Sequence, residues 1–478
     1  MKISVRALLI ASILYLIVPF CIFLFWWTNQ FLAGIITIAL VFVLYKYTQE
    51  VTGSIQISGK TLSILGMVLL FWTLISGTGH RGIFDGDFYK HSAILSDLIS
   101  FDWPVTYRLK ESHQYVYLVY YFAYYLPSAL IGKWLGWKAA NIALFAWTFG
   151  GISLAYIWLL SVIESKKQLW LGLLFPLFSG LDIVGRLIMG RKVVNDTDWE
   201  WWGRNWQYSG NTTLFFYVPQ HVLAGWICMG ILLYIFIKRK QLPLQELLFV
   251  STFLWSPFIF LGALPFYLFL ILQKKISFKI IPIILSLGIL MLQVLFFLSN
   301  MTLTVSETTA SGWLWNFEKV IGSFLLVRLA LFYLLEFCLF AFLLFKARKL
   351  SPLLVLACVL LLAIPWYKMG LMNDFAMRAS IPSLYVICIS WIAYLLQSKK
   401  TIVLYIALFI FMVGSIYPLV QIRNGIVHYS YGPPRYSLSQ LDQPKFRRQY
   451  LGNANSAFFS LFRHTIADRK VGTLSIQK

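Results

Sequence analysis

Long apolar runs separated by short polar stretches make up most of the chain up to residue 421. Many of these runs reach the roughly 20 residues that a helix needs to cross a bilayer. The pattern therefore predicts an all-α fold, a polytopic transmembrane helical bundle of about 12–14 crossings with extracytoplasmic juxtamembrane helices. The predicted helices cover residues 5–27, 31–47, 61–77, 139–163, 169–190, 214–237, 244–256, 258–272, 278–299, 321–346, 351–366, 378–397 and 401–421.

Two apolar stretches, 115–131 and 244–272, decide how the bundle is oriented. The first is barely long enough to span and is crowded with tyrosine, and Ser256–Pro257 interrupts the second. Proline removes a backbone donor and breaks a helix, so 244–272 is expected to form a helical hairpin or a re-entrant pair. If 115–131 also does not fully cross, all later basic loops face the cytoplasm, as the positive-inside rule requires. The N-terminus is then cytoplasmic, and the polar, aromatic-rich loops are extracytoplasmic.

Composition supports a membrane protein. Of the 478 residues, 59% are hydrophobic and 12% charged, which excludes an ordinary soluble domain. The formal net charge of +22 comes mainly from short loops, where lysine and arginine face anionic headgroups. The expected partners are therefore membrane lipids and not nucleic acid. The compact loops favour a bacterial plasma membrane, and the five cysteines, all in apolar runs, are expected to be inert.

The same pattern divides the chain into four segments. Residues 1–77 form the N-terminal transmembrane helices, and 78–138 form an extracytoplasmic acidic loop with juxtamembrane helices. Residues 139–421 form the main transmembrane bundle with its outer loops, and 422–478 form an extracytoplasmic tail. This tail is basic but too aromatic for typical disorder, so we expect it to pack as a small cap on the membrane face.

The acidic loop is the strongest candidate for a catalytic centre. Asp85 and Asp87 flank a glycine, and on the predicted helix 88–100 Asp87 shares one face with Lys90 and His91. Carboxylates at the mouth of a bundle can act as a general base or hold a divalent cation. We therefore expect Asp85 and Asp87 to be catalytic, and to bind any metal.

Lys90 and His91 are expected to bind a donor phosphate beside that base. Two of these residues have a structural alternative: Asp87 could cap its helix, and His91 could hydrogen-bond to the backbone. Asp97 and Asp102, further along the same stretch, are expected to be solvated.

A tryptophan-rich stretch supplies candidate sugar ligands. Glu200, Trp202, Gln220 and His221 combine aromatic faces with planar polar groups, and Arg204 among them is a further candidate phosphate ligand. Aromatic rings stack on the C–H faces of sugars while polar side chains take their hydroxyls. An aromatic belt at the water interface is the alternative for the tryptophans. A belt does not explain Gln220 and His221 at the start of a membrane helix, where polar residues usually line a cavity.

A third polar stretch, KMGLMNDFAMR, ends with Asp374 and Arg378 at i,i+4 spacing. A structural ion pair is one interpretation of this spacing. The other makes Arg378 a ligand of the lipid phosphate, because its fork of donors matches phosphate oxygens, with Asp374 contributing to the sugar or acceptor site.

At this point the chain resembles the GT-C superfamily of glycosyltransferases, which includes the protein O-mannosyltransferases, the oligosaccharyltransferase catalytic subunits and the bacterial aminoarabinose transferase. Asp85-Gly86-Asp87 stands where that family has its acidic motif, and FYKHSAILSDLI stands where it has its first juxtamembrane helix. The acidic loop usually follows helix one in the family, whereas here it follows helix three. The chain also resembles uncharacterised bacterial membrane proteins that share its QYS-x-NTT and NDF-x-MRASIP stretches, which carry no known activity.

The resemblance implies that the acid is a catalytic base or orients the acceptor, and that basic residues hold the polyprenyl phosphate of the donor. The expected function is therefore an extracytoplasmic glycosyltransferase that moves a sugar from a lipid-linked donor to a cell-envelope acceptor, with no cofactor required beyond an optional divalent cation. A lipid-linked glycan transporter or flippase and a non-enzymatic envelope assembly protein are the alternatives. The chain has no P-loop, GxGxxG, HExxH or GxSxG motif, which argues against ATP-driven pumps, dehydrogenases, zinc proteases and serine hydrolases.

Overall fold

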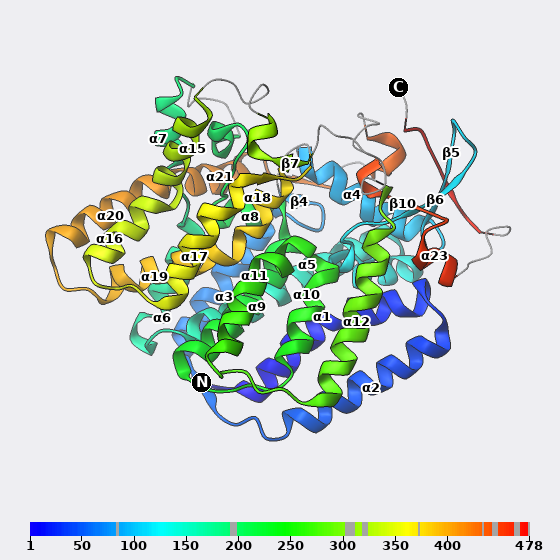
Figure 1. Ribbon diagram of the computed structural model, residues 1–478, viewed down its shortest axis with the longest axis horizontal. Coiled ribbons are helices and arrows are strands. Elements are labelled where there is room, and N and C mark those ends of the chain that lie inside the picture. Colours follow the sequence, from blue (N-terminus) through cyan, green and yellow to red (C-terminus); the bar gives the residue numbers. More distant parts are fainter. Residues whose placement is uncertain are drawn as a thin grey trace.

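Helices dominate the computed structural model (Figure 1). It describes residues 1–82, 86–191, 198–301, 311–317, 324–370, 373–432, 435–441, 448–462 and 469–476, so Asp85 lies outside the described residues. In these ranges nine helical stretches are long and apolar enough to cross a membrane, and three shorter apolar helices accompany them. The prediction of a polytopic helical protein is confirmed at this level.

The helix bounds follow the apolar runs closely, and α1 matches its predicted range to the residue. The helices are α1 (Val5–Trp27), α2 (Gln30–Thr48), α3 (Gly59–Leu74), α4 (Gly86–Ser100), α5 (Leu126–Ser161), α6 (Gln168–Leu174), α7 (Asp182–Ile188), α8 (Asn211–Tyr217), α9 (Pro219–Lys238), α10 (Gln245–Trp255), α11 (Pro257–Leu272), α12 (Ile280–Leu298), α15 (Leu325–Tyr333), α16 (Leu339–Lys346), α17 (Pro352–Ala363), α18 (Asp374–Ala379), α19 (Ile381–Gln397), α20 (Ile402–Gly414), α21 (Ile416–Val427) and α23 (Ala457–Leu461).

Helix α9 is the centre of the bundle, because its residues are buried on every face from Pro219 to Ile235. A helix that is apolar all round belongs inside the protein. Buried tryptophans tie the surrounding helices together through their ring nitrogens. Trp255 donates to the Leu16 carbonyl oxygen at 3.0 Å, and Trp158 donates to the Ser12 hydroxyl at 2.9 Å. Their large apolar rings are thus buried without leaving a donor unsatisfied.

Proline and serine set the breaks between neighbouring helices. Ser256 accepts a hydrogen bond from the Ile259 N–H at 3.1 Å and so begins α11, with Pro257 at its first position, which confirms the predicted break. Pro219 likewise separates α8 from α9, where the sequence predicted one helix over 214–237. The run 169–190 is also divided, into α6, a 3₁₀ turn at Phe175–Leu177 and α7.

The segment around 115–131 differs from the prediction. Tyr115–Leu118 is a strand, and α5 then runs from Leu126 through Ser161, with a kink at Gly136 where φ is 83°. Glycine has no Cβ and adopts this left-handed conformation at little cost. The backbone at Gly136 is not helical, so α5 consists of two helices. The predicted separation of 115–131 from a helix at 139–163 is therefore confirmed at this residue, although 115–131 begins as a strand.

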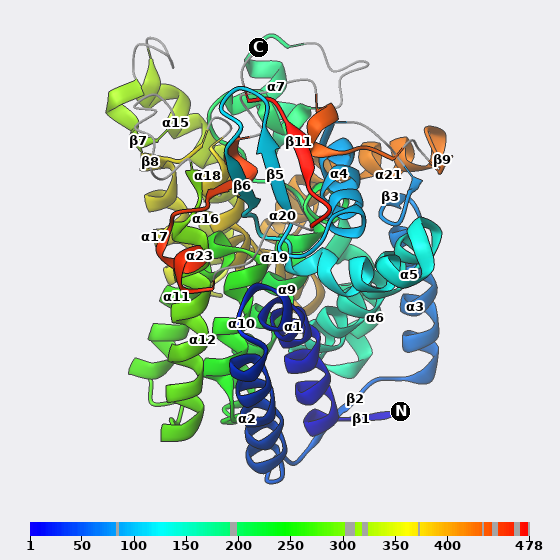
Figure 2. The ribbon, with the colours of Figure 1, turned by 90° about the vertical axis from the view of Figure 1, so that its right-hand side faces the viewer.

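A small sheet joins the loop after α4 to the C-terminal tail. Its strand order is β10 (Leu451–Asn453), β6 (Tyr115–Leu118), β5 (Thr106–Leu109) and β11 (Gly472–Leu474). β10 is antiparallel to β6, and β11 is parallel to β5. The sequence predicted a cap for this tail but no sheet. Figure 2 shows the sheet beside α4, at the end of the molecule opposite the N-terminus.

Three further sheets are short. β3 (Ser76–Gly77), β4 (Arg81–Gly82) and β9 (Ser430–Tyr431) pair together, as do β7 (Gly312–Trp313) and β8 (Tyr367–Lys368). These five strands lie at the same end of the bundle as α4 (Figure 2). β1 (Lys2–Ser4) and β2 (Ser54–Gln56) pair at the opposite end. The polar segments therefore gather at one end of the helices.

Asp97 of α4 holds the tail in place. It is only 1% exposed and accepts hydrogen bonds from the Tyr107 hydroxyl at 2.8 Å and the Leu438 N–H at 3.0 Å. Arg435 of the tail donates to the Ser96 hydroxyl at 2.8 Å. The expectation that Asp97 is solvated is therefore wrong. Burial raises the pKa of Asp97 to about 6, although its hydrogen bonds partly oppose that effect.

Replacing Asp97 with asparagine should remove part of the pH dependence of stability. A carboxyl with a raised folded-state pKa stabilises the protein below its unfolded pKa, and this contribution is lost as pH rises through about 6. The free energy of unfolding of the native protein, relative to Asp97→Asn, should fall by roughly 3 kcal/mol between pH 4 and pH 7. Chemical unfolding at both pH values in one detergent measures this difference. A difference that stays constant with pH would contradict it.

Candidate functional site

The first turns of α4 present an ion pair to the site. The Lys90 Nζ lies 2.8 Å from the Asp87 Oδ1, and the two side chains are 12% and 42% exposed respectively. Burial raises the pKa of Asp87, but the charge of Lys90 opposes this effect, and smaller contributions from His91 and Arg378 bring the pKa below its ordinary value. Asp87 is thus an ionised carboxylate at neutral pH.

His91 is locked between two tyrosines. One ring nitrogen, Nε2, lies 2.9 Å from the Tyr217 carbonyl oxygen, and the other hydrogen-bonds to the Tyr125 hydroxyl. A carbonyl can only accept, so these partners assign the proton to Nε2, and the hydroxyl donates to Nδ1. Burial and then the charge of Lys90 lower the pKa of His91 to about 4, which keeps the ring neutral.

Arg378 links α18 to the first turn of α9. Its Nε donates to the His221 Nε2 at 2.8 Å, and its guanidinium pairs with Asp374 one turn earlier. The His221 Nδ1 and both amide atoms of Gln220 meet no hydrogen-bond partner among the described residues, although both side chains are 0% exposed. Buried polar groups normally have partners, so these unmatched groups beside a guanidinium are candidates to bind water or a ligand.

Six predicted residues therefore come together from α4, α9 and α18. We call them the Arg378 cluster: Asp87, Lys90, His91, His221, Asp374 and Arg378. The charge of Arg378 acts on both Asp87 and His91, which places the two halves of the cluster within electrostatic reach of each other. Tyr121, in the segment between β6 and α5, packs against this cluster, with its ring centroid 4.8 Å from that of His221.

The other predicted site residues lie elsewhere. Arg204 is exposed at the end of a 3₁₀ turn with φ of 62° and, within the described residues, makes no hydrogen bond or ion pair with the cluster. Glu200 and Trp202 are each 1% exposed and lie in a second polar cluster. Asp85 is outside the described residues, so its predicted catalytic role is not tested.

The second cluster consists of the carboxyls of Asp182, Glu200 and Glu336, which we call the acid cluster. All three are at most 2% exposed. Glu200 accepts from the Gly210 N–H at 2.9 Å and from the Gln207 amide at 2.8 Å. Neither Asp182 nor Glu336 was among the candidate site residues predicted from the sequence. The available signal was an isolated acid inside an apolar run, which is costly and usually functional.

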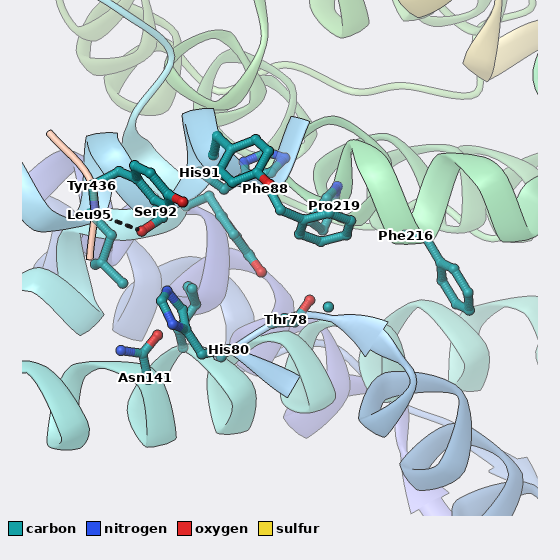
Figure 3. A pocket seen from close by; sticks show the side chains of 15 residues that line it. Thr78, His80, Phe88, His91, Ser92, Leu95, Asn141, Phe216, Pro219 and Tyr436 are labelled. Carbon is teal, nitrogen blue, oxygen red and sulfur yellow. Dashed lines mark hydrogen bonds between the residues drawn. The ribbon is translucent and has the colours of Figure 1, made fainter. Parts of the chain in front are cut away.

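A small cavity of about 40 Å³ adjoins the Arg378 cluster through His91. Figure 3 shows His91 and Ser92 of α4 on one side and Asn141 of α5 with His80 on the other. Most of its wall is apolar, including Phe88. The Asn141 Oδ1 faces this region, is buried, and meets no donor in the described ranges. At this volume the cavity has room for only a few water-sized groups.

A metal site is not formed by the residues that the structure describes. No group of three or more histidine, cysteine, aspartate or glutamate side chains there has the geometry to hold a metal ion. The predicted cation site at Asp85 and Asp87 includes a residue outside these ranges and stays a prediction.

Comparison with known proteins identifies no relative. No family model, no curated protein and no solved structure matches the chain. The function therefore has to be argued from the chemistry of the clusters themselves.

Replacing Arg378 with glutamine should destabilise the protein, because it leaves the partly buried Asp374 and the buried His221 without their partner. We expect the free energy of unfolding to fall by about 3 kcal/mol. Arg204→Gln is the matched control, since the same change at an exposed arginine should cost less than about 0.5 kcal/mol. Denaturant titrations of both variants in one detergent make the comparison. Equal losses in the two variants would show that Arg378 has no special structural role.

Proposed function

We propose that the protein is a GT-C-like glycosyltransferase that uses a sugar linked to a polyprenyl phosphate. The observation that carries the proposal is the convergence of an ionised carboxylate, an ammonium and a guanidinium, together with unmatched buried polar groups, at one end of an apolar helix bundle. A lipid-linked donor needs this combination, since its chain stays in the membrane while its phosphate and sugar meet polar groups at the membrane surface.

The cluster offers distinct groups for each part of the reaction. Asp87, kept ionised by Lys90, accepts the proton of an acceptor hydroxyl or orients that hydroxyl for attack on the anomeric carbon. The bond between that carbon and the phosphate oxygen breaks, and the phosphate leaves with the electron pair. Lys90 and Arg378 stabilise the charge that develops on it. The Gln220 amide and the His221 Nδ1–H are then available to sugar hydroxyls.

His91 has a positioning role in this scheme. Both of its nitrogens are engaged within the protein, so it fixes Tyr125 and Tyr217 around Asp87 and leaves phosphate binding to Lys90 and Arg378. The acceptor is proposed to be a hydroxyl of the cell envelope, and the cluster is proposed to face the extracytoplasmic side of a bacterial plasma membrane.

A lipid-linked glycan transporter is the second candidate. The observation in its favour is the charge inside membrane-spanning helices, where Asp182, Glu336 and Arg378 are all buried. Such residues mark transport paths as well as catalytic sites. Purified protein in vesicles separates the two functions, because a transporter moves a labelled lipid-linked sugar between leaflets without breaking its phosphate bond, whereas a transferase releases polyprenyl phosphate.

Asp87→Asn should abolish most of the transfer activity. A panel of labelled short-chain polyprenyl-phosphate sugars, mixed with envelope extract as acceptor, provides the assay. Loss of the carboxylate should lower the rate by about 100-fold or more, the usual contribution of a general base. Glu164→Gln, at a side chain that is 76% exposed, is the control and should keep the native rate. Full activity of a well-folded Asp87→Asn variant, and of Asp85→Asn beside it, would refute the proposal.

Lys90→Met should weaken binding of the donor phosphate. Polyprenyl phosphate without a sugar is the probe, and its affinity can be measured from the stabilisation of the protein against heat. Loss of one charge-assisted contact should raise the dissociation constant about tenfold, which corresponds to about 1.4 kcal/mol. Lys46→Met, at an exposed lysine of α2, should leave the dissociation constant unchanged. Equal binding to both variants would remove Lys90 from the phosphate site.

A further inference from the structure

The acid cluster is not used by the proposed reaction, and its geometry calls for a ligand of its own. Asp182 begins α7, and Glu336 lies in a π-helical segment, Leu334–Cys338, between α15 and α16. The Leu181 N–H donates to the Leu335 carbonyl oxygen at 3.1 Å, so the two backbones run side by side immediately before the two acids. π-Helical turns are rare and often occur at functional sites.

Each of these two acids has one satisfied and one unsatisfied oxygen. Ser179 donates to the Asp182 Oδ2 at 2.8 Å, and the Trp202 ring nitrogen donates to the Glu336 Oε1 at 2.8 Å. The Asp182 Oδ1 and the Glu336 Oε2 are buried and meet no donor in the described part of the chain.

The two side chains also lie within hydrogen-bonding reach of each other. A side chain at Gly180 would block this approach, because its Cβ would lie 2.0 Å from the Glu336 Oε2.

Glu200 is satisfied in a different way. The Gly210 N–H and the Gln207 amide donate to its carboxylate, and the same Gln207 amide also donates to the nearby Ser209 hydroxyl. Burial raises the pKa of Glu200, and these donors oppose that effect. A carboxylate with several donors can stay ionised, and its charge then disfavours ionisation of both neighbouring acids.

Two carboxyl oxygens can hydrogen-bond to each other only when one of them carries a proton. We propose that Asp182 and Glu336 form a proton-binding site, in which one carboxylic acid donates its O–H to the carboxylate of the other. One proton is bound and no other bond is made or broken. This pairing satisfies both buried oxygens, which the described residues otherwise leave without a donor.

The surroundings of the pair are acidic and phenolic. Glu200 faces it from the turn before Arg204, Tyr208 from the segment before α8, and Tyr417 from α21. Arg186, one turn further along α7, donates to the Asp198 carbonyl oxygen at 3.3 Å.

A polar chain leads from the acid cluster toward the Arg378 cluster. The Gln421 amide donates to the Tyr417 hydroxyl at 2.6 Å, and the Tyr217 hydroxyl donates to Gln421 at 3.2 Å. Tyr217 is also the backbone partner of His91. These hydrogen bonds connect Tyr417, which lies within electrostatic reach of Asp182 and Glu200, to His91, the last step passing through the Tyr217 backbone carbonyl.

Infrared spectroscopy of the full-length protein in lipid nanodiscs tests the shared proton directly. At pH 7 the native protein should show a protonated-carboxyl C=O band that shifts in D₂O. Asp182→Asn and Glu336→Gln should each remove that band, whereas Glu200→Gln and the exposed control Glu164→Gln should retain it. A native spectrum without the band, or a band that both pair variants keep, would overturn the proposal.

Two further measurements cover variants that do not fold and a competing ligand. Carboxyl carbon-13 NMR of the native protein, with labelled aspartate and glutamate, should show one protonated pair at pH 7, and two fully ionised groups would overturn the proposal. Adding sodium at constant ionic strength should leave the infrared band unchanged. Loss of the band on adding sodium would show that the site holds a cation instead. None of these readouts depends on glycosyl transfer.

Discussion

Charge inside an apolar bundle has to be paired or protonated, and the functional end of this protein is built around that constraint. An unpaired ion in such surroundings costs several kcal/mol, so each buried charge fixes the position of its partner. Arg378, only 7% exposed, is held by Asp374 within α18 and by His221 on α9. Because α9 is the most buried helix, this contact anchors α18 to the centre of the molecule. The same constraint pairs Lys90 with Asp87 at the start of α4.

Much of the fold could be predicted because the bilayer fixes the length of apolar helices. The break at Ser256–Pro257 was also predictable, since proline acts locally. The separation of α8 from α9 was not, because an apolar run looks the same whether its helix is straight, bent or divided. The sheet depends on pairing between residues 106–118 and 451–474, which are far apart in sequence, and its short strands leave no clear pattern.

Contacts among the candidate site residues could be predicted where helical spacing determines them and not elsewhere, while the roles of these residues stay predictions. Asp87 with Lys90, and Asp374 with Arg378, are neighbours on a helix surface, so their pairing follows from i,i+3 and i,i+4 spacing. Glu200 lies in the same polar stretch as Arg204, yet the 3₁₀ turn between them directs one inward and the other to solvent. Only tertiary structure could bring Glu336 to the acid cluster, more than a hundred residues away in the chain.

The two clusters differ in the ligand charge that they can accept. The acid cluster contains three carboxyls and, in the described part of the chain, no cation paired with them. Its negative electrostatic potential repels a phosphate and favours a proton. The Arg378 cluster balances two carboxylates with an ammonium and a guanidinium, and its unmatched Gln220 and His221 groups can bond to a neutral sugar. A sugar phosphate entering there can take donors from Lys90 and Arg378 while their carboxylates stay available to a hydroxyl. The balanced charges of the Arg378 cluster are therefore compatible with the anionic lipid-linked substrate proposed above, whereas the acid cluster disfavours it.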